Sequence, residues 1–473
     1  MPIPILTVSQ MREWENATWA AGRSEADVIS RVGYIVAQRA KQMTRPGDLI
    51  VVLAGKGHNG DDARQASRNF SDREVYLINV TEPEVSVKEF LSQLQLDPAL
   101  ILDGLFGVGL NRPLTGEWAK MVDKINSARV PILSIDVPSG LDAYTGEAQG
   151  TAIRATITLT LGAPKRGLLA STAWPHVGRL ELAADIGLIP RTLASDLQWT
   201  VREDFSDYPP ARPIAGHKGT FGHAVLFAGS VGYHGAAVLA ARSALRARPG
   251  LVTVFTSEEA YIPVASQLQA AMVHPWQPGR ELPDSATSVL FGPGLASPRV
   301  PAEMKSHLAR LWNESPLPVL VDASGLDWLP QGAVKAGALR VITPHPGEAA
   351  RLLKSRLNSV QNDRVRAVRD LSKLHGDCWI ALKGYQTLIG RSSGETFVNS
   401  SGNPLLAQGG SGDVLAGYLI GLMAQPALQS DWLTTLRYAV WQHGASADHL
   451  SLRQRNWVIE DLIDTLGNVP DSL

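Results

Sequence analysis

Apolar runs that end in polar, glycine-bearing loops recur along the chain, with helical patterns between them. The stretch Leu49–Ala54 is entirely apolar, which is typical of a strand buried in a parallel sheet. It leads into a loop, Gly55–Ala63, that opens a helix predicted to run through Phe70. Other predicted strands are 74–80, 99–102, 131–135, 155–161 and 179–182, and other predicted helices are 7–21, 26–43, 85–94 and 118–128. This alternation predicts an α/β unit.

The second half repeats the pattern, so it predicts a second α/β unit. Its predicted strands are 223–228, 251–255, 289–291, 319–321, 341–342 and 380–382. In both halves the strands end in polar or glycine loops, and ligands of open α/β sheets bind at those carboxyl ends. We therefore expect one site at the strand-end edge of each unit.

The segment from Ile189 to Pro213 shows no helical or strand periodicity and contains four prolines. We place the domain boundary there, near Asp207 to Arg212, which gives domains 1–210 and 211–473. A chain of 473 residues is too long for one ordinary core, so two domains are expected.

Composition narrows the functional classes. A formal net charge of -1 with dispersed basic residues argues against a nucleic-acid partner. No apolar run has the length of a membrane span, and the first residues lack a signal-peptide pattern, so we expect a cytoplasmic protein. Cys378 is the only cysteine, which excludes an intrachain disulfide, and its apolar neighbours predict a buried inert thiol.

The stretch Gly402–Gly417 carries the strongest chemical signal. Glycines crowd around Gly410 and Gly412, and a helical pattern begins near Asp413. A helix N-terminus suits phosphate or a developing oxyanion, and a carboxylate there can take a proton from a substrate hydroxyl. The alternative is a glycine hinge with Asp413 as an ordinary first-turn acid.

Three strand-end loops of the first half also predict a site. The loop after Leu49–Ala54 matches neither a Walker loop nor the dinucleotide fingerprint. Asp103 opens the second loop, up to Leu110, and Asp136 opens the third, up to Asp142. Either aspartate could instead be a helix cap; three such loops on one edge favour a ligand site.

These motifs together resemble the bifunctional NAD(P)H-hydrate repair enzymes, which fuse an NAD(P)HX epimerase to an ADP- or ATP-dependent NAD(P)HX dehydratase. In the second half the resemblance rests on Lys218–Gly222, Gly292–Leu295, Thr343–Glu348 and the Gly402–Gly417 stretch. It implies a ribokinase-like α/β domain there. In the first half it rests on Asp103–Leu110 and Asp136–Asp142, and it implies a Rossmann-like three-layer αβα domain.

One loop departs from the family. The family usually has Gly-x-Gly-Asn-Asn-Gly-Gly-Asp-Gly, whereas His58, Asp61 and Ala63 here replace an Asn and two glycines. Asn59 and Asp62 hold their places. A carboxylate at Asp61 would repel a bound phosphate, so the first domain could instead be a non-catalytic nucleotide-binding module.

The resemblance implies a set of roles. Asp413 is the implied base of the dehydratase, and Asp136 is the implied acid or base of the epimerase. Magnesium and ADP, or ATP, are implied for the dehydratase, with ADP favoured by the fused architecture. Potassium is implied near Asn59, Asp103 and Ser139. The implied hydrate contacts are His58, Asn59, Gly60, Asp61, Asp62, Gly107, Val108, Gly109, Leu110, Asn111, Arg112, Pro113, Ala237, Gly294 and His345, and the implied nucleotide contacts are Lys383, Gly384, Tyr385, Gln386, Thr387, Gly410, Ser411 and Gly412.

The substrates implied are NADHX and NADPHX, and we expect a homo-oligomer. The dehydratase would phosphorylate the ring hydroxyl to make a good leaving group, and the epimerase would recycle the other epimer. A small-alcohol kinase, such as a vitamin-precursor kinase, is the alternative, since it would share the fold and the Asp413 loop. His345 could also be a rigid-turn residue, and Lys383 a solvated base.

Overall fold

The computed structural model describes residues 2–110, 112–335 and 337–470 and contains two compact units, Ile3–Leu197 and Gln198–Leu473. The units divide upstream of the predicted boundary near Asp207 to Arg212. The absence of regular structure expected between Ile189 and Pro213 is wrong, since this segment contains β8 (Leu197–Thr200) and the 3-10 helix η2 (Arg202–Phe205). The β8 sequence Leu-Gln-Trp-Thr alternates apolar and polar residues, but four residues are the shortest run that gives a strand signal.

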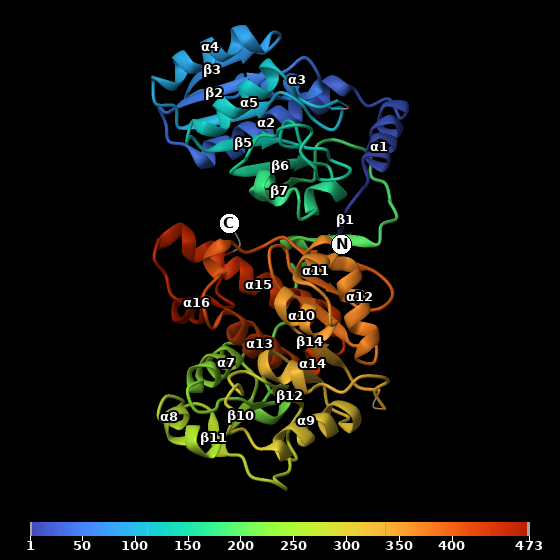
Figure 1. The fold of residues 1–473 in the computed structure, drawn as a ribbon, viewed down its shortest axis with the longest axis vertical. Helices are drawn as coiled ribbons and strands as arrows, with labels where there is room; N and C mark the ends of the chain where they lie inside the picture. The colour runs from blue at the N-terminus through green and yellow to red at the C-terminus, as the bar shows by residue number, and fades with distance from the viewer. Residues whose placement is uncertain (1, 111, 336, 471–473) are drawn as a thin grey trace. The chain divides into compact units, whose positions relative to one another are not determined.

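The first unit is built on a six-stranded parallel sheet in the order β3-β2-β4-β5-β6-β7 (Figure 1). Helices α2 and α3 pack on one face of this sheet, and α4 and α5 on the other, which gives three layers. The strands are β2 (Leu49–Ala54), β3 (Glu74–Asn79), β4 (Leu100–Gly104), β5 (Ile132–Ile135), β6 (Ile157–Leu161) and β7 (Arg179–Ala183), preceded by β1 (Ile3–Pro4). The helices are α1 (Val8–Ala20), α2 (Glu25–Met43), α3 (His58–Ser67), α4 (Pro83–Leu94), α5 (Glu117–Ser127), η1 (Arg166–Leu169) and α6 (Trp174–Val177).

The strand order of this sheet determines where a ligand can enter. The chain leaves β2 toward β3 on one side and returns to β4 on the other. Loops that follow adjacent strands in opposite directions open a crevice between them. The predicted loops after β2 and β4 therefore flank the switch point.

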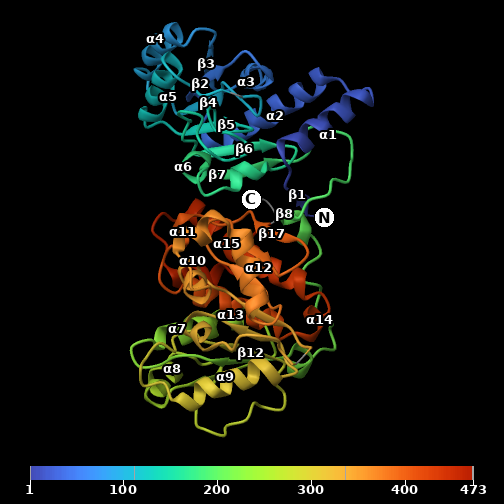
Figure 2. The same ribbon diagram turned by 45° about the vertical axis from the view of Figure 1, so that its right-hand side comes forward.

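The second unit contains a larger sheet in the order β8-β17-β16-β15-β14-β13-β12-β9-β10-β11. Figure 2 shows its strand β12 with α13 on one side and α9 on the other. Strands β9 to β15 run parallel, and β16 and β17 are antiparallel. The strands are β9 (His223–Phe227), β10 (Leu251–Thr256), β11 (Met272–Pro275), β12 (Ser288–Phe291), β13 (Val319–Val321), β14 (Arg340–Ile342), β15 (Trp379–Leu382), β16 (Leu388–Gly390) and β17 (Thr396–Asn399). The helices are η3 (Lys218–Phe221), α7 (His234–Arg246), η4 (Glu258–Ala260), α8 (Tyr261–Ala265), α9 (Ala302–Glu314), η5 (Ala323–Trp328), α10 (Pro346–Leu352), α11 (Leu357–Asn362), α12 (Arg364–Leu374), η6 (Pro404–Leu406), α13 (Ser411–Met423), α14 (Pro426–Gln429), α15 (Trp432–Arg453) and α16 (Ile459–Thr465).

The two faces of this sheet are covered differently. Helices α7, α13 and α15 bury an aliphatic face. On the opposite face the Phe227 ring stacks on Phe255 and Phe291, with centroids 5.2 and 5.1 Å away, and contacts His307 of α9 at 5.3 Å. This doubly covered sheet confirms the predicted α/β class of the second half.

Two other expectations concern single features. Cys378 is 3% exposed, and burial raises the pKa of its thiol, so the prediction of a buried inert thiol is confirmed. Among the described helices, none has both the length and the apolar composition needed to span a membrane.

Candidate active sites

The loops after β2, β4 and β5 are joined by hydrogen bonds at the carboxyl edge of the first sheet. The Gly55 N–H donates to the Gly104 carbonyl at 3.0 Å. The Asn59 side-chain amide donates to the Phe106 carbonyl at 2.9 Å, and the Phe106 N–H donates to Ser139 Oγ at 2.9 Å. The three predicted strand-end loops thus lie together.

Asp103 is completely buried between these loops. Ser139 donates to it through its N–H at 3.0 Å and through its hydroxyl at 2.5 Å, and the Ser134 hydroxyl donates at 2.8 Å. Burial raises the Asp103 pKa, and these donors oppose the rise. Within the described ranges, no cationic side chain forms an ion pair with Asp103. Asn59, Asp103 and Ser139 are thus brought together around a buried carboxyl group that lacks a counter-charge.

Asp136 follows β5 with a left-handed backbone, φ 63°. Its Oδ1 forms an ion pair with Lys165 and accepts the Leu161 N–H at 3.1 Å. Lys165 is 1% exposed and also donates to the Leu161 carbonyl at 2.8 Å. These contacts fix the Asp136 carboxylate in position and give it a buried counter-charge.

Two other carboxyl groups, Asp62 of α3 and Glu15 of α1, interact electrostatically with Asp136. Burial raises the pKa of Asp62 to about 8, and repulsion from Asp136 is the next cause. Burial and then Asp136 raise the pKa of Glu15, while Lys165 opposes the rise. The site therefore combines a carboxylate that has a fixed counter-charge with a carboxyl group that binds a proton near neutral pH, an arrangement typical of acid–base sites.

The positions that depart from the family's loop have local partners or a buried place. His58 Nε2 lies 3.1 Å from Glu25 Oε1, and the His58 side chain is largely exposed. Asp61 Oδ1 forms an ion pair with Arg64 Nη2 at 2.8 Å, so the added carboxylate is paired with a guanidinium. Ala63 is completely buried in the core between α2, α3 and the sheet.

Glycines allow the close approach of these loops. A Cβ at Gly60 would lie 2.0 Å from the Gly55 carbonyl oxygen, and one at Gly107 would lie 3.4 Å from Asn59 Cβ. Gly60 and Gly107 therefore lie beside the Asn59 site. Of the other predicted contacts in this segment, Val108 and Leu110 are half-buried, Gly109, Arg112 and Pro113 are exposed, and Asn111 lies outside the described residues.

In the second unit, Asp413 lies in the first turn of α13, as predicted. The N-cap is Gly410 with φ 93°, a left-handed conformation that favours glycine. A Cβ at Gly412 would lie 3.1 Å from Lys383 Nζ. Because the first N–H groups of a helix have no acceptor within it, this turn presents N–H donors beside an ammonium group. The structure thus brings Asp413, Gly410, Ser411, Gly412 and Lys383 together.

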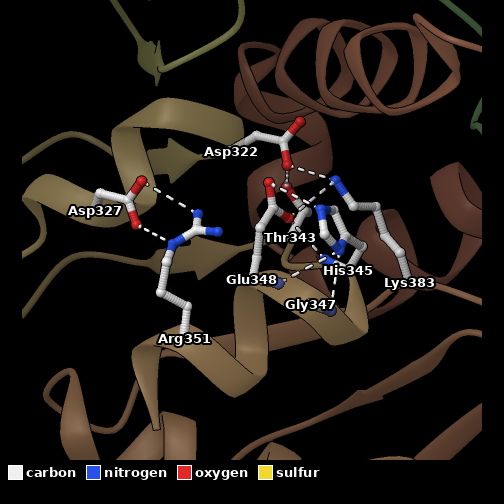
Figure 3. A network of polar contacts seen from close by, with 8 residues as sticks. All are labelled: Asp322, Asp327, Thr343, His345, Gly347, Glu348, Arg351 and Lys383. Atoms are coloured by element: carbon white, nitrogen blue, oxygen red, sulfur yellow. Dashed lines mark hydrogen bonds and ion pairs between the residues drawn. The ribbon is translucent and has the colours of Figure 1, made fainter. Parts of the chain in front are cut away.

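Lys383 is the centre of a polar network with Asp322, Thr343 and Glu348, here called the lysine network (Figure 3). Lys383 Nζ lies 2.7 Å from Asp322 Oδ1 and 4.0 Å from Glu348 Oε2, and the Thr343 hydroxyl donates to Asp322 Oδ1 at 2.8 Å. Burial lowers the pKa of Lys383, but attraction to Asp322 and Glu348 outweighs it and the net pKa is raised. Lys383 is therefore a buried ammonium group between two carboxylates, not a solvated base.

The same charges act on Asp413. Burial raises its pKa to about 7, and repulsion from Asp322 adds to the rise while Lys383 opposes it. A carboxyl group with a pKa near the working pH is suited to general base catalysis.

His345 is the N-cap of α10 (Figure 3). Its Nδ1 accepts the N–H groups of Gly347 at 3.0 Å and Glu348 at 3.3 Å, and Glu348 Oε2 accepts the His345 N–H at 2.8 Å. These bonds give His345 a structural role in a rigid turn. Its ring is 55% exposed, so one edge stays accessible to a ligand.

The predicted nucleotide segment, 383–387, is held by a buried arginine. Arg364 Nη1 donates to the carbonyls of Tyr385 at 2.5 Å and Gln386 at 3.2 Å. The Thr387 hydroxyl donates to the Gly384 carbonyl at 3.3 Å. Burial lowers the pKa of Arg364 to about 10, so it stays charged at neutral pH.

Gly294 and Ala237 lie together around the loop after β9. Gly294 has φ 67°, its carbonyl accepts the Ser230 hydroxyl at 2.6 Å, and a Cβ there would lie 2.4 Å from the Tyr233 carbonyl oxygen. Ala237 is completely buried, and a Cβ at Gly229 would lie 2.9 Å from the Ala237 Cβ. In the described part of the chain, no hydrogen bond or ion pair joins this pair to the lysine network.

The sequence prediction missed four residues that contact site residues. Asp322 and Glu348 belong to strand-end motifs, so their position could have identified them. Lys165 and Arg364 are far in sequence from the loops that they hold, and no spacing rule connects them.

Within the described ranges, no group of three or more His, Cys, Asp and Glu side chains is arranged to hold a metal ion.

Comparison with known proteins covers both units. A family model described as NAD(P)H-hydrate dehydratase matches residues 224–468, and one described as YjeF-related protein N-terminus matches residues 77–167. Among solved structures, the chain is similar to the ADP/ATP-dependent NAD(P)H-hydrate dehydratase from Bacillus subtilis, co-crystallised with ATP/Mg2+. That protein is 30% identical, with 55% of this chain and 92% of that chain covered and a TM-score of 0.49.

Similar proteins along the whole chain are bifunctional NAD(P)H-hydrate repair enzymes. The one from Coxiella burnetii is 32% identical, with 93% of each chain covered. The one from Gloeobacter violaceus is 33% identical over 98% of this chain and 97% of its own, and the one from Leishmania major is 33% identical over 88% and 78%. These matches confirm the resemblance expected from the motifs. The chain belongs to the family of bifunctional NAD(P)H-hydrate repair enzymes.

Proposed function

We propose that this chain repairs hydrated NADH and NADPH, with an epimerase in its first unit and an ADP-dependent dehydratase in its second. One observation carries the dehydratase assignment: Asp413, with a pKa of about 7, lies in the first turn of α13 beside the Lys383 ammonium group. Family membership supports both assignments. A single cysteine, which is buried, is in keeping with a cytoplasmic location.

In the proposed dehydration, Asp413 takes the proton of the hydroxyl group on ring carbon 6. The hydroxyl oxygen then accepts a phosphoryl group from ADP, so phosphate replaces hydroxide as the leaving group. The ring nitrogen lone pair expels phosphate, and loss of a proton from carbon 5 restores the reduced nicotinamide. The products are NADH or NADPH, AMP and phosphate.

The residues at the helix N-terminus have electrostatic roles in this step. The N–H groups of Gly410, Ser411 and Gly412 and the Lys383 ammonium group would offset negative charge on the moving phosphoryl group. The segment 383–387, held by Arg364, would position the nucleotide. Gly294, Ala237 and His345 would contact the hydrate.

Magnesium would neutralise phosphate charge when it is bound with the nucleotide. Asp322 is already engaged by Lys383 and Thr343, and Glu348 by the His345 N–H. We therefore propose that the phosphate oxygens and water supply most ligands of this ion, with the protein offering few.

In the epimerase, Asp136 is the proposed acid or base, because inverting carbon 6 requires proton transfer near the ring. The loops His58–Asp62 and Gly107–Pro113 would line the hydrate site. Potassium fits the cluster of Asn59, Asp103 and Ser139, because the buried Asp103 carboxylate lacks a counter-charge and the donors are hard oxygens. The Asp61–Arg64 pair supports an active epimerase, because it offsets the carboxylate that departs from the family's loop.

Product analysis tests the dehydratase proposal. The protein is incubated with the hydrate, ADP and magnesium, and NADH, AMP and phosphate are quantified. We expect the three products in equal amounts, and a loss of all three in Asp413→Asn. A stable phosphate ester of the substrate without recovered NADH would contradict the proposal and favour a small-alcohol kinase.

A further inference from the structure

Helix α15 contacts both ends of the glycine-rich stretch that leads into α13. His443 and Asp448 are each 8% exposed. His443 Nε2 lies 3.1 Å from the Ser411 carbonyl oxygen, at the start of α13. At the other end, Asp448 accepts the Gly402 N–H at 2.9 Å and the Asn403 side-chain amide at 3.0 Å. One helix therefore holds the stretch at its beginning and at its end.

The His443 imidazole acts as a hydrogen-bond donor in this contact. Burial lowers its pKa to about 4; the bond to the Ser411 carbonyl opposes the fall, and the positive charge of Lys383 adds to it. A neutral imidazole has one N–H, and a contact with a carbonyl oxygen requires that proton on Nε2. A carbonyl oxygen has two lone pairs, so the Ser411 carbonyl can accept this bond and its own helical bond.

The rest of α13 is fixed in another way. A Cβ at Gly417 would lie 2.1 Å from the Ala240 carbonyl oxygen, so the middle of α13 packs directly on the backbone of α7. The first turn meets side chains instead: a Cβ at Gly410 would lie 2.5 Å from Leu239 Cδ1 of α7, and one at Gly412 would lie 3.1 Å from Lys383 Nζ. The His443 bond adds a direct hydrogen bond to the backbone of this turn, two residues before Asp413.

We propose that His443 is a positioning residue of the dehydratase: its bond to Ser411 holds the first turn of α13 so that Asp413 faces the substrate hydroxyl. Asp448 anchors the other end of the stretch. This inference rests on the proposed role of Asp413. A buried histidine that only satisfies its own hydrogen bond would stabilise the fold without affecting that role.

Two variants that differ by one methylene provide the test. In His443→Gln the longer side chain places an amide N–H near the Nε2 position, whereas in His443→Asn the amide ends short of Ser411. His375→Asn is the control for replacing a buried imidazole: His375 is 1% exposed, its Nδ1 contacts the Pro330 carbonyl at 3.0 Å, and the asparagine amide can keep that contact. We expect kcat of the dehydratase to fall roughly 10- to 100-fold in His443→Asn, since small misplacements cost about this much. We expect His443→Gln to have most of the wild-type kcat, and His375→Asn to have a kcat equal to that of the wild type.

The pH profile of kcat separates positioning from stability. Asp413 faces Asp322, Glu348 and Lys383, and burial is the main cause of its raised pKa. A loosened first turn admits water, so we expect the acidic limb of the His443→Asn profile to move to lower pH. The limb should return in His443→Gln and stay unchanged in His375→Asn.

Hydrogen exchange provides a measurement that does not need activity. The Val414 amide, which donates to the Gly410 carbonyl at 2.9 Å at the start of α13, should exchange faster in His443→Asn than in the wild type, with no such change in His375→Asn. The inference would be overturned if His443→Asn kept the kcat and the exchange rate of the wild type. It would also be overturned if kcat fell equally in His443→Gln and His443→Asn. A wild type inactive with ADP and ATP would refute the proposed function, and the exchange result would still decide whether His443 holds this turn.

Discussion

Asp413 differs from the carboxylates around it in its hydrogen bonding. Asp322 accepts hydrogen bonds from Thr343 and Lys383, and Glu348 accepts one from the His345 N–H. Within the described residues, no hydrogen bond is made by the Asp413 side chain. Asp413 is therefore the member of this group whose side chain is not engaged by neighbouring donors, which suits it to accept the substrate proton.

The pH dependence of dehydration follows from the Asp413 pKa of about 7. A base must be ionised, so kcat/KM should fall about tenfold per pH unit once the pH is well below this value. In Asp322→Asn a repulsive charge is lost and Lys383 attracts Asp413 more strongly. Both effects favour the ionised form of Asp413, so the acidic limb of the kcat/KM profile should move to lower pH.

Asp327→Asn is the control for this profile. Asp327 is in the same unit but pairs with Arg351 at 2.7 Å on the surface (Figure 3). Its removal should leave the limb in place. A limb that stays near the wild-type position in Asp322→Asn would mean that this carboxylate does not act on the base.

Lys165→Met tests the counter-charge of Asp136. Leaving one partner of a buried pair uncompensated costs about 3–5 kcal/mol, so we expect a loss of unfolding free energy of this order and a loss of epimerase activity. Denaturant unfolding measures the first, and interconversion of the hydrate epimers measures the second. The double variant Lys165→Met/Asp136→Asn should recover part of the stability; a double variant less stable than the single one would contradict the pairing.

At this scale the sequence predicted the residues that lie in motifs. Asp103 and Asp136 come at the ends of apolar strands and Asp413 at the start of a helical pattern, so their positions could be inferred. Lys165 and Arg364 depend on which segments the fold brings together, and local pattern has no information on that.

The strands and helices were predicted largely from periodicity. Leu49–Ala54 is the observed β2, because an entirely apolar run has one plausible place in a covered parallel sheet. Helix α3 begins at His58, inside the predicted loop, because the loop's last residues form its first turn. Strand β8 was missed because its alternation, Leu-Gln-Trp-Thr, lasts for only four residues in a mostly polar segment.

Gly412→Ala tests the close approach of Lys383 to the first turn of α13. A Cβ would lie 3.1 Å from Lys383 Nζ, and a flexible side chain can move away at low cost. Alanine is the better helix former, so stability should stay equal or rise by up to about 1 kcal/mol. The displaced ammonium group should lower kcat by roughly tenfold. Gly409→Ala, where a Cβ meets nothing within 4 Å, should leave kcat unchanged; an equal loss there would refute the explanation.

The hydrate loop of the first unit allows a charge test. In Arg64→Gln the Asp61 carboxylate loses its partner, so KM of the epimerase for NADPHX should rise several-fold. Stability should fall modestly, because the pair is half-buried and Arg64 Nη1 also donates to the Gly55 carbonyl at 2.9 Å. The double variant Arg64→Gln/Asp61→Gly should restore KM. If KM does not rise in Arg64→Gln, the pair does not act on the bound hydrate.

For the whole molecule, the sequence predicted two α/β units, and the structure has two compact units. The predicted boundary lies later in the chain than the division between these units, because it was inferred from the prolines near Pro209. Phe205, upstream of these prolines, packs on Tyr438 and Trp441 and so belongs to the second unit. The expected homo-oligomer stays a prediction. The two proposed activities form one repair, since the epimerase converts the hydrate that the dehydratase rejects.

The most direct test is the recovery of reduced cofactor from a mixture of both hydrate epimers with ADP, magnesium and potassium. It is run briefly at mildly alkaline pH, to limit spontaneous epimerisation. We expect complete recovery, faster than in Asp136→Ala. Recovery that stalls when one epimer is consumed would contradict the epimerase assignment, and no recovery with either ADP or ATP would contradict the central claim.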